Sequence, residues 1–218
     1  LPEKKSAITQ HLDPSIVPIP AVATETAMRA LKEAAIQTLM TTDGKFGALS
    51  SGLPPTHSEV EKSDHKLKMI LQEMEEIQKF VIAIRTDSPE SAARYTSLLH
   101  ALDHTRRMIR LVVHNLNEVK LTNPSERIYP VVVQLEAHIT EAIKALQEDN
   151  MRPTVQKIAE FSQELARFRK KERAGIFETT AKGEVQVSEA FQYVQLILQV
   201  DGISYHLWRM MHHLSEDE

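Results

Sequence analysis

One pattern occurs twice in this chain, 98 positions apart. The first copy runs Tyr95-x-x-Leu98-Leu99-x-x-x-Asp103 and closes with His114-x-Leu116, and the second runs Tyr193-x-x-Leu196-Ile197-x-x-x-Asp201 and closes with His212-x-Leu214. This period is longer than the roughly 20–50 residues of solenoid repeats. The sequence therefore predicts two copies of one small helical unit rather than an extended array.

Apolar residues recur at helical spacing through most of the chain, and the β-branched alternation of strands is scarce. The predicted fold class is all-α. We expect six helices, over about 21–41, 58–84, 89–119, 126–149, 153–180 and 184–214. Asp43-Gly44 is expected to end the first, the pattern Ser58-x-x-Glu61 to cap the second, and Gly175 to break or fray the fifth.

The predicted helices divide into three plus three. Residues 1–20, with Pro14, Pro18 and Pro20, are expected to be an extended linker. Residues 21–121 then form the first three-helix repeat and residues 125–218 the second. The fold predicted from this division is a tandem pair of three-helix bundles.

Charge and composition limit the ligands that we expect. The net charge is −4 and the isoelectric point is near 6.2, which disfavours nucleic acid and bulk attraction to an anionic membrane. The chain has no cysteine, so disulfides and thiolate metal sites are excluded. The most apolar stretch, 190–200, is short and contains three glutamines, so we expect no insertion of this chain into a membrane.

Sequence signatures of catalysis are missing. The chain has no phosphate-binding glycine loop, no dinucleotide fingerprint, no Gly-x-Ser-x-Gly and no His-Glu-x-x-His. The Glu-x-x-His pair of di-iron bundles is also absent. We therefore expect a protein that is not an enzyme.

Asp103 and Asp201 occupy equivalent places in the two repeats, beside apolar positions that make their burial plausible. One interpretation is a metal or phosphate-linked site between helices, with His206 as the third candidate ligand. The other, which we favour, pairs each carboxylate with Arg106, Arg107 or Arg209, because buried charges are usually paired. Within one helix the acids and histidines do not share a face, so a metal site would need ligands from two helices.

Two further features have alternative interpretations. The basic run 167–173 is more simply a solvated helix face, and the alternative is contact with an anionic partner or lipid headgroups. Most methionines and Trp208 are expected in the core. A last helix that carries Trp208, Met210 and Met211 also offers a surface for a homodimer.

Two three-helix units with an acidic residue in each third helix resemble the PhoU-like fold. The lead-in His11-Leu12-Asp13-Pro14-Ser15-Ile16-Val17-Pro18-Ile19-Pro20-Ala21-Val22-Ala23 resembles the opening of the region that follows the transmembrane part of bacterial type II sodium/phosphate cotransporters. The resemblance implies a soluble regulatory domain on the cytoplasmic face of the inner membrane. Its partner would be the transmembrane part of the same transporter, and it would modulate phosphate transport.

Free-standing PhoU proteins gather iron or zinc clusters with a Glu/Asp-x-x-x-Asp signature in each third helix. Asp103 and Asp201 match its first acid, but Arg107 and Tyr205 stand where the second acid belongs. A fixed cation repels a metal cluster, so we expect no metal cofactor. The alternatives are a free-standing PhoU-like regulator of phosphate uptake and, from another class, a metal-dependent helical-bundle enzyme.

Overall fold

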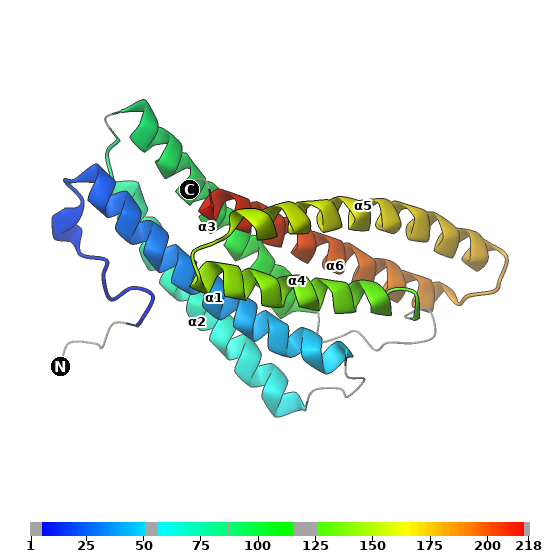
Figure 1. Cartoon of the computed structure of the whole chain (residues 1–218). Coiled ribbons are helices and arrows are strands. Elements are labelled where there is room, and N and C mark those ends of the chain that lie inside the picture. The colour runs from blue at the N-terminus through cyan, green and yellow to red at the C-terminus, as the bar shows by residue number, and fades with distance from the viewer. Residues whose placement is uncertain (1–5, 51–55, 87, 116–125, 216–218) are drawn as a thin grey trace.

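The computed structural model describes residues 6–50, 56–86, 88–115 and 126–215, and in these ranges the chain is helical with no strand. The prediction of an all-α fold is confirmed (Figure 1). The helices are η1 Pro14–Ile16, α1 Pro20–Ser50, α2 His57–Ala83, α3 Pro89–Asn115, α4 Tyr129–Gln147, α5 Arg152–Ala181 and α6 Val187–Leu214.

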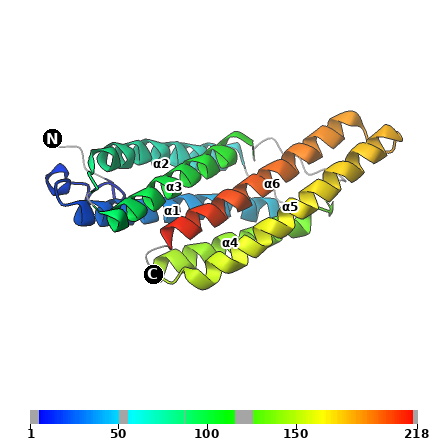
Figure 2. The same ribbon diagram turned by 90° about the horizontal axis from the view of Figure 1, so that it is seen from above.

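The six α-helices form two groups of three. Helices α1, α2 and α3 contact one another, and so do α4, α5 and α6. The two groups meet where α1 contacts α4 and where α3 contacts α6, as the view in Figure 2 shows. The first helix of one group thus packs on the first helix of the other, and the third helix packs on the third. The duplication remains a prediction, because Leu116 and the His114 side chain lie outside the described part of the chain.

One contiguous hydrophobic cluster of the described residues joins both groups. Helix α1 contacts α2, α3 and α4, so it buries side chains on several faces. Small side chains on α1 allow its neighbours to approach closely, because the distance between packed helices depends on the side chains between them. Ala23, Ala27, Ala34 and Ala35 of α1 are fully buried, as is Leu31.

Helix α1 does not end at Asp43-Gly44, and that prediction is wrong. The helix continues to Ser50 and buries Phe46 completely. A glycine inside a helix costs about 1 kcal/mol, whereas burying a phenylalanine side chain gives about 2–3 kcal/mol, so tertiary packing decides. Asp43 also accepts a hydrogen bond from the Thr140 hydroxyl of α4 (3.1 Å).

Helix α2 is capped two residues earlier than predicted. The Thr56 hydroxyl accepts from the Glu59 amide (3.3 Å), and the Glu59 carboxylate accepts from the Thr56 amide (2.8 Å). This reciprocal pair is a capping box. The predicted pair, Ser58 and Glu61, lies inside the helix, where Glu61 instead pairs with His57 (3.2 Å).

Helix α5 runs unbroken through Gly175, against the prediction of a break or fray there. The helix ends at Ala181, and Gly183, two residues later, has a φ of 77°, in the left-handed region that favours glycine. The amides of Gly183 and Glu184 donate to the carbonyls of Thr180 and Thr179, each at 3.0 Å. These are the two hydrogen bonds of a Schellman motif, which satisfies the last helical carbonyls.

The lead-in packs on the bundle instead of extending away from it. Ile8 and Leu12 are buried in the core cluster. The Asp13 carboxylate accepts from the Ser15 amide (2.9 Å) and caps η1, and Pro20 is the first residue of α1. The lead-in is therefore tied directly to the central helix. None of the described helices has an apolar stretch long enough to cross a bilayer.

The predicted core residues are largely confirmed. Met74, Met108, Met210 and Met211 are fully buried, and Met69 is exposed. Trp208 is only partly buried against the core cluster, and its ring contacts the Tyr205 ring and the Arg209 guanidinium.

Candidate functional site

Helices α3 and α6 bring four imidazoles together, which we call the histidine cluster: His100, His104, His206 and His213. His100 stacks on His213, with 4.9 Å between ring centroids, and His104 lies beside both His213 and His206 (5.9 and 5.2 Å). Residue numbers rise along α3 as they fall along α6, so the two helices are antiparallel here. The cluster therefore lies at the contact between the two helical groups.

A direct polar contact in the cluster joins the Nδ1 atoms of His104 and His206, which are 2.9 Å apart. At this distance one ring donates a proton and the other accepts it, so at least one ring is neutral. The Tyr205 ring packs edge-on against both, at 5.9 Å from His104 and 5.2 Å from His206.

The surroundings of the cluster favour neutral imidazoles. Burial, helped by the nearby His206 and Arg209, lowers the pKa of His104 to about 4, whereas Asp103 opposes the shift. Burial also lowers the pKa of His206, helped by Arg107 and opposed by Asp103. Within the cluster, His104 and His206 are thus a hydrogen-bonded pair whose neutral forms are favoured by burial and by the nearby Arg107 and Arg209.

Asp103 is exposed rather than buried, which corrects the expectation from the repeat. Its Oδ2 accepts from Nε of Arg107 one helical turn away (2.8 Å). The predicted pairing with Arg107 is confirmed. Arg106 points elsewhere and donates to Gln78 of α2. Asp103 is exposed because it lies on the outer side of α3, a helix that buries its neighbour Leu102 instead.

Asp201 is the better buried of the two acids, with its side chain 15% exposed, and its partner is Arg169 of α5. Arg169 Nε lies 3.1 Å from Asp201 Oδ2. That nitrogen is buried and has no well-aligned acceptor, so the contact is an ion pair of imperfect geometry. Burial raises the pKa of Asp201, and Arg169 opposes the rise.

Arg209 is not the partner of Asp201, and that alternative is wrong. Its Nη2 donates to Nε2 of His213 (3.0 Å), and its guanidinium lies 5.3 Å from the centroid of the Trp208 ring. Sequence reasoning could not find Arg169, because this residue is on another helix inside a run that looked uniformly solvated.

The structure does not gather the predicted metal candidates around one point. Asp103 and Asp201 have separate arginine partners, and His206 faces His104. In the part of the chain that the structure describes, no group of three or more histidine, aspartate or glutamate side chains could hold a metal ion. The spacing in the sequence did predict that any assembly of histidines must come from two helices.

A second polar feature is a cavity of about 430 Å³ between α5, α6 and the chain before α4. The Tyr193 hydroxyl donates to Oε2 of Glu172 (2.8 Å), and Arg127 lies 3.7 Å from the same carboxylate. Burial and Glu172 both raise the pKa of Tyr193. The repeated tyrosine of the second copy therefore serves as a hydrogen-bond donor between two helices. Nothing in the sequence signalled this cavity.

Comparison with models of protein families, with curated proteins and with solved structures gave no match for this chain.

Proposed function

We propose that this chain is a regulatory and interaction module of a sodium-dependent phosphate symporter, on the cytoplasmic face of the membrane, and that it has no catalytic activity of its own. The proposal starts from the resemblance of the lead-in and of the paired three-helix units. Its partner would be the transmembrane part of the same transporter.

The observation that supports the proposal best is how the lead-in is held. Leu12 is buried in the core, Asp13 caps η1, and α1 begins at Pro20, four residues after η1 ends at Ile16. Ala23, the last residue of the resembling segment, is fully buried. A displacement applied to this segment would move α1 rather than be absorbed by a loose linker.

Helix α1 is suited to pass on such a displacement because it contacts α2, α3 and α4. Regulation requires that the bundle pack better on the transporter in one transport state than in another. The histidine cluster and the Asp201 to Arg169 pair lie at contacts between α3, α5 and α6, where small shifts of these helices change the packing.

The test is sodium-dependent uptake of radiolabelled phosphate by cells that express the complete gene, compared with the same gene lacking residues 21–218. We expect a changed uptake rate at equal transporter abundance in the membrane. Leu12→Asp should reproduce the deletion, and Ile82→Gln, at an exposed position of α2, should not. Uptake that is independent of sodium, or unaltered by the deletion, would refute the proposal.

A further inference from the structure

The outer face of α6 carries an exposed apolar stripe. Val187, Phe191, Leu198 and Tyr205 are 59%, 62%, 40% and 43% exposed. At 100° per residue their spacings of four, seven and seven place all four within a sector of about 40°, along a length of about 27 Å. Exposed single apolar residues are common, but four in one line form a contiguous apolar patch, which is typical of a binding surface.

Helix α5 extends this patch. Arg169, Arg173 and Phe177 follow one another at intervals of four residues, so they form a row along one side of α5. The row begins at the contact of Arg169 with Asp201 of α6. It ends at Phe177, which is 40% exposed and lies 5.8 Å from the Arg173 guanidinium. We call the stripe together with Phe177 the α5–α6 face.

Exposed cations border this face. Lys170 and Arg173 lie on the same side of α5 as Phe177, whereas Arg167 and Lys171 lie on the opposite side. Lys170 and Arg173 are exposed, and neither forms an ion pair with a residue that the structure describes. The acid within the same run, Glu172, turns inward to Tyr193 and Arg127. The patch is therefore locally positive, although the whole chain has a net charge of −4.

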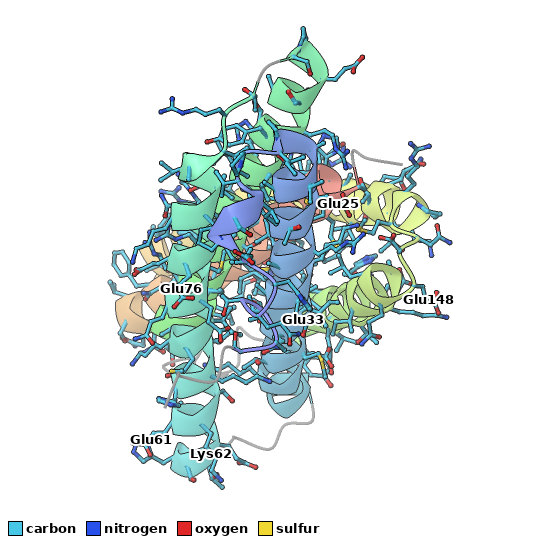
Figure 3. All side chains as sticks on the ribbon, turned by 90° about the vertical axis from the view of Figure 1, so that its left-hand side faces the viewer. Glu25, Glu33, Glu61, Lys62, Glu76 and Glu148 are labelled. Carbon is cyan, nitrogen blue, oxygen red and sulfur yellow. The ribbon has the colours of Figure 1, made fainter. Side chains whose placement is uncertain are left out.

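The position of the face leaves it accessible. The paired ends of α5 and α6 project beyond the other four helices (Figure 2). Figure 3 looks from the end of the molecule opposite to these projecting ends, with α1 and α2 in front and α5 and α6 behind.

We propose that the α5–α6 face binds the surface of an anionic phospholipid membrane. Aromatic and aliphatic side chains of a helix lying in the interface enter the boundary between headgroups and acyl chains, while lysine and arginine bind the lipid phosphates. Nucleic acid fits less well because the centre of the face is apolar. A second copy fits less well because it would bring two sets of unpaired cations together. The inference rests on this surface and not on the proposed function.

The test is sedimentation of the purified chain with vesicles. One set contains phosphatidylcholine alone, and the other contains about 30% phosphatidylglycerol, which gives a negative surface. We expect binding to the anionic vesicles, weakened by raising the salt from about 0.1 M to about 0.5 M, because salt screens surface charge. Equal binding to both vesicle types, or binding to neither, would overturn the proposal.

Matched variants locate the binding surface. Lys170→Glu with Arg173→Glu should lower the partition coefficient by about 30-fold or more, since each cation near an anionic surface contributes about fivefold. Lys66→Glu with Lys68→Glu, at exposed positions of α2, is the charge control. Phe191→Gln should lower binding by about tenfold. Ile82→Gln, at a side chain that is also 62% exposed, should leave binding unchanged.

Two results would contradict the assignment even if vesicles sediment the protein. One is that the α2 variants reduce binding as much as the α5 and α6 variants. The other is that sedimentation velocity shows a dimer that Phe191→Gln converts to a monomer, in which case the face joins two copies.

Discussion

Nδ1 of His104 lies 2.9 Å from Nδ1 of His206, so a histidine of the first helical group and one of the second share a single hydrogen-bonding proton. If both rings were protonated, both Nδ1 atoms would be donors and the hydrogen bond would be lost. Arg107 and Arg209, which lower the pKa values of these rings, would then face two more cations. The contact between α3 and α6 is therefore sensitive to acid.

The first prediction concerns stability against pH. Because the folded-state pKa of His104 is about 4, against 6.5 in the unfolded chain, the unfolded state binds more protons between these values. The stabilisation is fully present above pH 6.5 and is lost as the pH falls toward 4. We expect His104 to account for about 1 kcal/mol of this loss, reduced from the unscreened value because the ring is half-exposed.

Urea unfolding between pH 7 and pH 4.5 measures the effect. His104→Gln should flatten the dependence of the unfolding free energy on pH, and His65→Gln, at an exposed position of α2, should keep the wild-type slope. Equal slopes for all three proteins would show that the histidine cluster does not contribute.

The two repeated aspartates should differ in their effect on stability. Asp201→Asn leaves the largely buried Arg169 without its counter-ion and should cost about 1–2 kcal/mol of unfolding free energy. Asp103→Asn removes an exposed pair and should cost less than about 0.5 kcal/mol. Urea unfolding at pH 7 compares them. A larger loss for Asp103→Asn would contradict the burial seen here.

Two glycines inside helices can be replaced with a gain in stability. An added Cβ at Gly44 or Gly175 meets nothing within 4 Å. Because alanine favours the helix over glycine by about 0.5–1 kcal/mol, Gly44→Ala and Gly175→Ala should each raise the unfolding free energy by that amount. Gly183→Ala is the control and should destabilise the chain, since its φ is 77°. Loss of stability at Gly44 or Gly175 would mean that the helix breaks there after all.

The position of the α2 cap can be tested directly. Thr56→Ala removes the side-chain acceptor of the capping box and should cost about 1 kcal/mol. Ser58→Ala, at the position that the sequence pattern favoured, should change stability by less than about 0.5 kcal/mol. Thermal unfolding followed by circular dichroism distinguishes the two. A larger loss of stability for Ser58→Ala than for Thr56→Ala would show that Ser58, and not Thr56, caps the helix.

Metal content is a further prediction. Asp103 and Asp201 each have an arginine partner, and cations flank the histidine cluster. We expect elemental analysis of the dialysed protein to give less than one iron, zinc or manganese per chain. Arg107→Asp, which restores the spacing of two acids, should increase metal uptake. Stoichiometric metal in the wild-type chain would support the metal-dependent alternatives.

Helix type and number could be read from the sequence, whereas several boundaries could not. The apolar spacing correctly predicted six helices, because a buried stripe constrains the helix more than any single residue does. Gly44 and Gly175 were interpreted as breaks, yet both helices continue. At Gly44 the reason is the burial of Phe46 against a distant part of the chain, which local propensity does not contain.

The candidate site was only partly predictable for the same reason. The repeat drew attention to Asp103 and Asp201, and the pairing of Asp103 with Arg107 lies within one helix, where the spacing of four residues is enough to find it. The pairing of Asp201 with Arg169 joins two helices, and so does that of Tyr193 with Glu172. No spacing along the chain encodes these contacts.

The sequence by itself determined that the described segments fold into helices, how many α-helices these segments form, and which residues on each are apolar, because these follow from periodicity within single segments. Tertiary structure decided which helices meet, how deeply each aspartate is buried, and that His104 lies against His206. Those properties depend on the register and packing of helices far apart in the chain, where side-chain fit outweighs local preference.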